Sequence, residues 1–405
     1  MIEIEKAQQI VLEHARALPA EMVSLWAAAG RVLCDDVTSD SDSPPFDKAL
    51  MDGYAVRAAD AVAGAELDVA GSLTAGQVAT CPLQPRQAVR IMTGAPVPTG
   101  ADAVVMFEHT EAVGVDRVRI RQADVKVGQN ILPKGASMKR GEMLLPAGRQ
   151  LRPIDVGLLA EVGQTAVRVT RKPEVAILAT GDELVEPEAI PQPGQIRNSN
   201  AAMLAALAST AGADARSLGI ARDEPSELER LVRHGLASDV LLLTGGVSMG
   251  DRDYVPQVLE RLAVRRLFHG VNVKPGKPIW CGLYEQEGRQ CWVFGLPGNP
   301  VSSLVCFELF VRPALDMLCG RGDRRAERFG KARLAVPFEH RADRVTYYPA
   351  TASFYDGQPR VRPLNWKGSA DLRTLADATA LLVIPSGTIC WPLGEEVGVY
   401  WLPSR

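Results

Sequence analysis

Three strand-sized apolar runs in the centre of the chain are each followed by a glycine-containing loop and then by a helix-like segment. The runs cover residues 174–179 and 239–243 and a stretch that ends at 293–294, and the helix-like segments cover 201–211, 254–262 and 301–318. Strands that are apolar on both faces and alternate with helices are typical of a parallel sheet with helices on both sides. We therefore predict a doubly wound α/β domain over residues 173–325.

The sequence on either side of this domain is predominantly β-like. Short segments of alternating polar and apolar residues, separated by turns, predict a β-rich module over residues 34–137, with strands near 88–92, 103–107 and 117–121. Strand-like segments at 381–384 and 396–400 predict a C-terminal β domain over residues 326–405. The first ~30 residues are interpreted as a helix, and 151–172 as a helix followed by a strand. Residues 1–33 and 138–172 are assigned to a helical and mixed linker domain.

Composition excludes several classes of protein. The 45 Lys and Arg residues nearly balance the 48 Asp and Glu residues, which gives no support for a nucleic-acid-binding protein. No apolar run reaches the ~20 residues of a membrane helix, and the acidic start of the chain does not fit a secretory signal. Seven cysteines without a C-x-x-C pair predict a reduced, cytoplasmic protein in which Cys306 and Cys319 are core residues.

The loops after the three apolar strands predict a binding site for an anion. The carboxyl ends of parallel strands form the usual ligand edge of an open α/β sheet, and glycine lets backbone N–H groups approach a phosphate or another oxyanion. The alternative is that these loops are only tight turns with helix caps. The presence of three such loops at one edge favours the anion site over this alternative. The residues concerned are Thr180, Gly181, Asp182, Gly245, Gly246, Ser248, Pro297, Gly298, Asn299 and Pro300.

Several carboxylates are expected at the same edge. Asp182, Glu183, Asp251 and Asp253 follow predicted strands, and Asp223 lies in the segment Ala221-Arg-Asp-Glu-Pro225. So many acids at one edge would repel an anion unless a cation lay between them. Mg²⁺ resolves this conflict because it binds carboxylate and phosphate oxygens together. Some of these acids, Asp251 above all, could instead cap helices.

Two lysines are expected to supply the opposite charge. Lys274 and Lys277 lie in a loop stiffened by Pro275 and Pro278, which limits the directions of the two ammonium groups. Such an arrangement suits a tetrahedral oxyanion, although each lysine by itself could be an ordinary surface residue.

Six groups of motifs spread over nearly the whole chain occur together. They are Met51-Asp-Gly-Tyr-Ala55, Ile91-Met-Thr-Gly-Ala-Pro-Val-Pro98, Thr180-Gly-Asp-Glu-Leu184, Gly245-Gly-Val-Ser248 with Gly250-x-x-Asp253-Tyr254, Lys274-Pro-Gly-Lys-Pro278 and Leu296-Pro-Gly-Asn-Pro-Val-Ser302. In order and content they resemble the molybdopterin molybdenumtransferases, the family of the bacterial MoeA proteins and of the E domain of gephyrin. Each motif is weak alone, but the set is highly specific.

The resemblance implies a multidomain α/β plus β fold. Its parts would be a doubly wound molybdopterin-binding α/β domain, a β-rich module, the linker domain and a C-terminal β-barrel-like domain, in an elongated subunit that forms a homodimer. The cleft would lie between the α/β domain of one chain and the β module of the other. The implied reaction inserts molybdate into adenylylated molybdopterin with Mg²⁺, releases AMP and yields molybdenum cofactor. An adenylyl-transfer protein is a possible partner under this resemblance, and no nucleic acid or membrane is expected to take part.

The resemblance also assigns roles to residues of this chain. It implies that Asp47, Glu183, Asp223 and Asp253 are catalytic, and we take the last three as the metal ligands. Thr93 joins the pterin- and phosphate-binding loops, and Lys274, Lys277 and Ser369 match positions associated with molybdate.

The sequence departs from the family pattern at five positions of interest. A loop that carries two arginines and an aspartate in the family has Leu132, Pro133 and Ser137 here, and basic family positions fall at Gly270 and Pro349. These changes leave the α/β cradle intact and remove basic groups elsewhere.

Two alternatives stay open at this stage. A non-catalytic molybdopterin-binding or scaffold protein would have little need for the four retained acids, and a related pyrophosphatase would hydrolyse the adenylate without molybdate. The sequence does not distinguish molybdate from tungstate.

Overall fold

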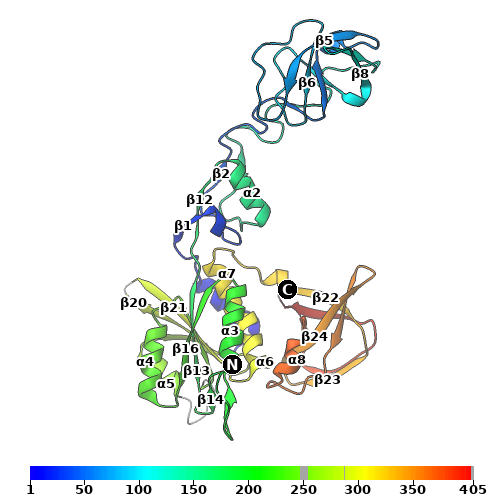
Figure 1. The fold of residues 1–405 in the computed structure, drawn as a ribbon. Helices are drawn as coiled ribbons and strands as arrows, with labels where there is room; N and C mark the ends of the chain where they lie inside the picture. Colours follow the sequence, from blue (N-terminus) through cyan, green and yellow to red (C-terminus); the bar gives the residue numbers. More distant parts are fainter. Residues whose placement is uncertain (247–253, 287, 403–405) are drawn as a thin grey trace. The chain divides into compact units, whose positions relative to one another are not determined.

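The computed structural model describes residues 1–246, 254–286 and 288–402, and it divides into two compact units (Figure 1). Unit 1 contains Met1–Cys34, Gly148–Arg152 and the described residues from Val167 onward, and unit 2 contains Asp35–Ala147 and Pro153–Ala166. The four-domain boundaries drawn from the sequence remain a prediction.

Unit 1 is built around a six-stranded sheet with the order β16-β13-β17-β21-β20-β18. The strands are β13 (Glu174–Thr180), β16 (Asp214–Ala221), β17 (Val240–Thr244), β18 (Arg265–His269), β20 (Trp280–Gln286) and β21 (Arg289–Leu296). The first four strands in the sheet order are parallel, as the sequence predicts. The sheet is nevertheless mixed, because β20 runs antiparallel to β21 and β18 antiparallel to β20.

Helices cover both faces of this sheet (Figure 1), which confirms the doubly wound prediction. Ile177 and Leu242 face one core and their neighbours Leu178 and Leu243 face the other, as the two-residue period of a strand requires. The first core is covered by α1 (Ile4–His14), α3 (Ser199–Thr210), α6 (Pro300–Cys306) and α7 (Arg312–Leu318), and the second by α4 (Pro225–Gly235) and α5 (Val255–Arg261). A π-helical turn, Phe307–Val311, joins α6 and α7. Cys306 and Cys319 are buried here, as predicted.

The C-terminal part of unit 1 is a closed β-barrel, which confirms the predicted fold class. Its ring of strands runs β24 (Val345–Tyr355), β25 (Gln358–Pro363), β22 (Phe329–Leu334), β28 (Glu396–Trp401), β26 (Ala380–Ile384) and back to β24. The short strand β19 (Val273–Lys274) of the α/β domain pairs with β24. A hairpin of β23 (Phe338–Ala342) and β27 (Gly387–Trp391) and the helix α8 (Leu372–Ala376) complete this part.

The prediction that the first ~30 residues form one helix is wrong beyond His14. Helix α1 ends there, and the chain continues into β1 (Ala20–Ser24), which pairs with β12 (Ala166–Thr170), and a 3₁₀ turn at Leu25–Ala27. Pro19 keeps a helix from continuing through the rest of the predicted segment, because proline removes a backbone donor and disfavours helical geometry at the preceding residue.

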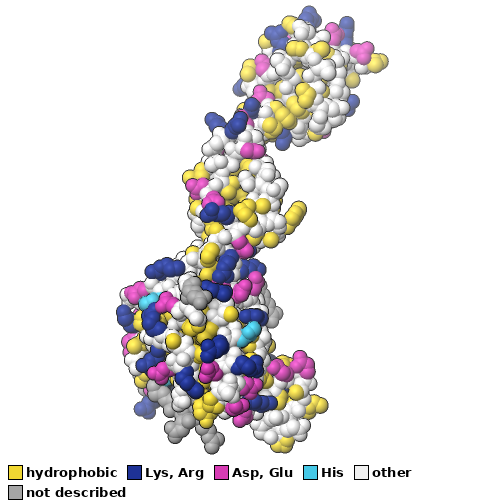
Figure 2. Space-filling view, turned by 90° about the vertical axis from the view of Figure 1, so that its left-hand side faces the viewer, with side chains coloured by type: hydrophobic (Ala, Val, Ile, Leu, Met, Phe, Trp, Pro, Cys, Tyr) yellow, Lys and Arg dark blue, Asp and Glu magenta, His cyan; other side chains and the backbone are white. Residues whose placement is uncertain are grey.

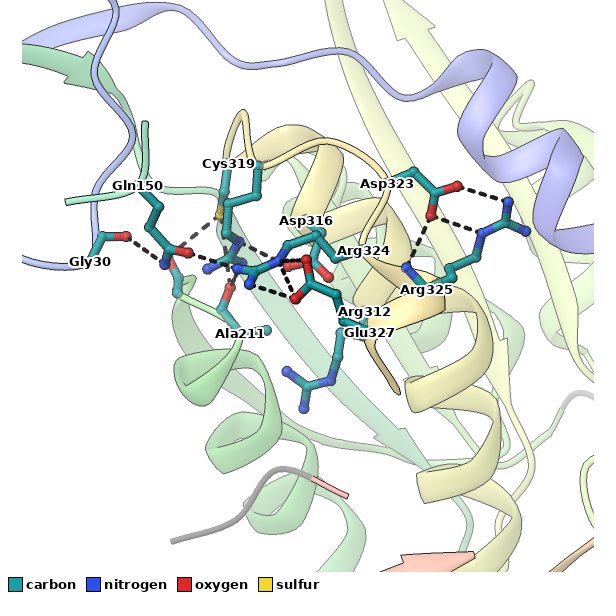
Figure 3. Close-up of polar contacts among 12 residues, drawn as sticks. Gly30, Gln150, Ala211, Arg312, Asp316, Cys319, Asp323, Arg324, Arg325 and Glu327 are labelled. Carbon is teal, nitrogen blue, oxygen red and sulfur yellow. Dashed lines mark hydrogen bonds and ion pairs between the residues drawn. The ribbon is translucent and has the colours of Figure 1, made fainter. Parts of the chain in front are cut away.

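A polar network within unit 1 links two connecting segments to the loop that follows α7 (Figure 3). Arg324 Nη1 donates to Gln150 Oε1 at 2.7 Å, and Gln150 Nε2 donates to the carbonyl of Gly30 at 3.2 Å. Arg324 also pairs with Glu327, three residues later. The segments around residues 30 and 150 are therefore anchored to the α/β domain by side chains as well as by backbone pairing.

Unit 2 is β-rich, as predicted. Its six-stranded sheet has the order β7-β4-β6-β5-β9-β8, and the helix α2 (Pro153–Glu161) lies outside it. The strands are β4 (Gly53–Val56), β5 (Glu66–Leu73), β6 (Gln87–Ile91), β7 (Ala103–Met106), β8 (Thr110–Val113) and β9 (Arg117–Ile120). Short pairs link β2 (Val37–Thr38) to β11 (Met143–Leu145), and β3 (Lys48–Ala49) to β10 (Ile131–Leu132).

Charged side chains of both signs are interspersed over the face of the molecule in Figure 2. None of the helices within the described ranges is long and apolar enough to span a membrane.

Candidate functional site

Three loops meet at the carboxyl ends of β13, β17 and β21. A side chain at Gly245 would place its Cβ 2.5 Å from the Thr180 carbonyl oxygen, and one at Gly246 would lie 2.8 Å from Thr180 Oγ1. The Gly245 N–H donates to the carbonyl of Leu296 at 3.2 Å, which brings the third loop against the second. Glycine is required here because only a residue without a side chain permits this approach, and both glycines have positive φ. Thr180, Gly181, Gly245, Gly246 and the 297–300 segment thus form one glycine-lined edge.

Asn200, at the start of α3, fastens two of these loops and was not predicted from the sequence. Its Nδ2 donates to Gly298 O at 2.6 Å and to Thr244 Oγ1 at 3.0 Å. The side chain is buried, and these two donor contacts fix the orientation of the amide. Asn198, two residues earlier, has the separate task of capping α3 by accepting the Ala201 N–H.

The loop after β13 also contacts the loop after the neighbouring strand β16. The Asp223 N–H donates to Asp182 Oδ1 at 3.2 Å, and Arg222 Nη1 donates to the Asp182 carbonyl at 3.0 Å. The Glu183 carboxylate folds over Gly181, where a Cβ would lie 2.4 Å from Oε2. Asp182, Glu183 and Asp223 are all exposed and lie at one edge of the sheet, as predicted. The strand that precedes Asp223, β16, was not predicted.

Part of the predicted site lies outside the described residues. This holds for Ser248, Asp251 and Asp253, so the complete predicted metal set of Glu183, Asp223 and Asp253 is not seen together. Among the residues that the structure does describe, no group of three or more His, Cys, Asp or Glu side chains could hold a metal ion.

The lysine loop packs against α6 and against the barrel. A Cβ at Gly276 would lie 2.5 Å from Cys306 Sγ, so this loop is pressed onto the helix. Lys274 belongs to β19, and its Nζ is 3.9 Å from Asp343 Oδ1 of the barrel. Lys277 is exposed. The geometry thus places the loop that carries both lysines against α6, whereas the convergence of the lysines on one anion remains a prediction.

Ser369 reaches the glycine-lined edge from the barrel side. Its hydroxyl accepts from Asn299 Nδ2 at 3.0 Å, and its carbonyl accepts the Val301 N–H at 3.0 Å. Asp371 holds the same turn by accepting the N–H groups of Lys367 and Thr374 at 3.0 Å each. Hydrogen bonds from the hydroxyl and N–H of Thr374, together with the Lys367 N–H, hold the pKa of Asp371 below its usual value. Residues 70 positions apart in the chain thereby meet at the start of α6.

The two candidate residues of unit 2 lie in interacting segments. Asp47 Oδ1 accepts the Lys134 N–H at 2.8 Å, and its carbonyl accepts the Val97 N–H from the loop that contains Thr93. Asp52, which the motif includes but to which the sequence assigns no role, accepts both the N–H and the hydroxyl of Thr93 at 2.7 Å. These bonds hold the pKa of Asp52 below its usual value.

The departures from the family pattern have structural settings of their own. Gly270 has a φ of +79°, which favours glycine over lysine, and a Cβ there would lie 3.3 Å from Met1 Cγ. Pro349 is buried in β24 opposite Leu381. Leu132 pairs with Lys48.

Comparison with known proteins agrees with this architecture. Three family models match the chain: the MoeA N-terminal region (domain I and II) over residues 2–163, a probable molybdopterin binding domain over 176–317, and the MoeA C-terminal region (domain IV) over 331–402. A molybdopterin molybdenumtransferase from Nostoc sp. is 38% identical over 95% of this chain and 89% of its own length. The Bacillus subtilis protein of the same name is 35% identical over 98% of this chain and 93% of its own length.

A solved structure gives the same result for the fold. A molybdopterin biosynthesis MoeA protein from Pyrococcus horikoshii superposes with a TM-score of 0.79 at 32% identity, covering 99% of this chain and 100% of that one. With relatives this similar over nearly its whole length, the chain belongs to the molybdopterin molybdenumtransferase family.

Proposed function

We propose that this chain inserts molybdenum from molybdate into adenylylated molybdopterin, releases AMP and yields molybdenum cofactor. The names of its relatives support the coarser statement that it is a transferase of molybdenum cofactor biosynthesis. The observation that carries the finer proposal is the glycine-lined edge, where three loops meet without side chains at their closest approach and where Asn200 fastens two of them.

Each part of this edge has a task in the proposed reaction. The glycine loops bind the diphosphate through backbone N–H groups, which are fixed before the ligand arrives and need little reorganisation. Lys274, Lys277 and Ser369 bind molybdate beside the start of α6. Holding both reactants in one place supplies most of the rate, because phosphoryl transfer depends chiefly on positioning and charge neutralisation.

Mg²⁺ is the proposed cofactor. Glu183 and Asp223 fit it because they are exposed oxygen ligands on adjacent strand ends, with Asp253 as the third predicted ligand. When bound, Mg²⁺ would neutralise diphosphate charge and polarise the phosphorus atom of the diphosphate bond that breaks when AMP is released. The residues of the chain orient the ligand, and the arrangement of Asp182 and Arg222 holds the Asp223 backbone in place.

Asp47 and Thr93 complete the proposal through a homodimer. They lie in unit 2, whereas the glycine-lined edge lies in unit 1. We propose that unit 2 of one chain serves the site of its partner.

The test measures AMP release from adenylylated molybdopterin with and without molybdate and with and without Mg²⁺. The proposal expects release that requires both. Release at the same rate without molybdate would favour the pyrophosphatase, and binding without any release would favour the scaffold.

Matched carboxylate variants locate the reaction. We expect Glu183→Gln and Asp223→Asn to slow AMP release by about a hundredfold or more, a typical loss for removing an electrostatic contact at a reacting centre. Glu188→Gln, an exposed acid a few residues away from Glu183, is the control and should match the parent. Equal rates in all three variants would overturn the assignment of these acids.

A further inference from the structure

A buried ion pair lies inside the helical segment that begins at the candidate site. Arg312 donates to both carboxylate oxygens of Glu308, Nε to Oε2 and Nη2 to Oε1, each at 2.7 Å. The side chains are 2% and 0% exposed, and the guanidinium lies over the ring of Phe307. Glu308 belongs to the π-helical turn between α6 and α7, and such turns often occur near functional sites.

The barrel supplies the third member of this cluster. The Tyr400 hydroxyl, on β28, is 3.0 Å from both the carbonyl oxygen and Oε2 of Glu308. Burial and the neighbouring carboxylate raise the pKa of Tyr400, so the hydroxyl keeps the proton that it donates. A hydrogen bond to a buried charged group is stronger than one between neutral exposed groups. The hydrogen bond from Tyr400 to Glu308 therefore links the barrel strongly to the helical segment.

The barrel touches the same helical segment at its first turn as well. There the Ser369 hydroxyl accepts from Asn299 Nδ2, and the Ser369 carbonyl accepts the Val301 N–H. The contact with Asn299 is exposed, whereas the Glu308 cluster is buried. Figure 1 shows α8, which follows Ser369, beside α6. Besides the pairing of β19 with β24, the barrel thus contacts this helical segment through a buried, charge-assisted attachment at Glu308 and through an exposed attachment at the candidate site.

We propose that Tyr400, with Glu308 and Arg312, positions Ser369 against the first turn of α6. The expected effect of Tyr400 on kinetics rests on the proposed function. The expected effect of Tyr400 on the position of the Ser369 turn rests on the contacts alone. The Tyr400 hydroxyl contacts Glu308, which is not a predicted ligand group, so Tyr400 is a positioning residue that acts through the Ser369 turn.

Hydrogen exchange at the Val301 amide tests the structural part without any substrate. The first N–H groups of a helix have no partner within the helix, so the protection of Val301 comes from the Ser369 carbonyl. In Tyr400→Phe we expect this amide to exchange about tenfold faster, which corresponds to ~1.4 kcal/mol of weaker closure. Tyr347→Phe is the control, because Tyr347 is a buried barrel tyrosine for whose hydroxyl no hydrogen bond is described within the ranges that the structure covers.

A double-mutant cycle tests the kinetic part. Tyr400→Phe and Ser369→Ala should each raise the molybdate concentration needed for half-maximal AMP release, and the double variant should match Ser369→Ala alone. Additive effects would show that Tyr400 does not act through Ser369 and would overturn the proposal. Unchanged hydrogen exchange at Val301 in Tyr400→Phe would overturn the positioning proposal. This result does not depend on AMP release, so failure of the positioning proposal can be told apart from failure of the proposed function.

Discussion

Removing the amide of Asn200 should loosen two loops of the candidate site at once. Asn200→Ala deletes the bond from Nδ2 to Gly298 O at 2.6 Å, which is partly buried, and the bond to Thr244 Oγ1 at 3.0 Å, which is buried. At about 1 kcal/mol per bond, with an added penalty for the carbonyl that loses its donor, the unfolding free energy should fall by about 2–3 kcal/mol. For a domain of this size the melting temperature should fall by about 4–12 °C.

Asn198→Ala is the matched control. Asn198 is also a buried asparagine of the same segment, but its side chain caps α3 by accepting the Ala201 N–H, so its loss should cost about 1 kcal/mol. Urea unfolding and AMP-release kinetics separate the two residues. We expect the KM for adenylylated molybdopterin to rise about tenfold in Asn200→Ala and to stay within about twofold of the parent in Asn198→Ala. An equal KM in both variants would refute the view that Asn200 shapes the ligand site.

Three further predictions concern other parts of the account. Lys274→Ala should raise the molybdate concentration for half-maximal AMP release about tenfold while leaving the KM for the pterin adenylate nearly unchanged, and the reverse pattern would assign the lysine to the phosphate site. The pKa of Asp371 is lower in the folded than in the unfolded chain, so the carboxylate stabilises the fold fully above its unfolded pKa and loses this effect as the pH falls through its folded pKa. The unfolding free energy should therefore fall less steeply with decreasing pH below about pH 4 in Asp371→Asn than in the parent. Mixing Asp47→Asn chains with Glu183→Gln chains should restore activity if two subunits share each site, and no recovery after confirmed subunit exchange would exclude sharing.

The parallel core of the α/β domain could be predicted from sequence because its strands are apolar on both faces. β13 and β17 are almost wholly buried, so nearly every residue carries the signal. β16 gives no such signal, because it is the edge strand and alternates irregularly between exposed and half-buried residues. The antiparallel strand β18 is likewise partly exposed and carries two adjacent arginines, Arg265 and Arg266.

The candidate site was predictable to the extent that its residues lie in short local motifs. The glycine loops and the Asp182–Glu183 pair occur as contiguous patterns after strands, and the structure brings them to one edge. Asn200 could not be assigned in this way, because its task depends on Thr244 and Gly298, which approach it only in the folded sheet. The contact of Ser369 with Asn299 joins two domains and has no local pattern either.

The central claim is that release of AMP and insertion of molybdenum are one coupled reaction at the glycine-lined edge. A single-turnover experiment with enzyme in excess of adenylylated molybdopterin, in the presence of molybdate and Mg²⁺, measures AMP released and molybdenum bound in the pterin product of the same sample. The account predicts equal amounts with the same time course in the parent, and a parallel loss of both in Glu183→Gln. AMP that forms faster than molybdenum is inserted, or at an undiminished rate without molybdate, would contradict it.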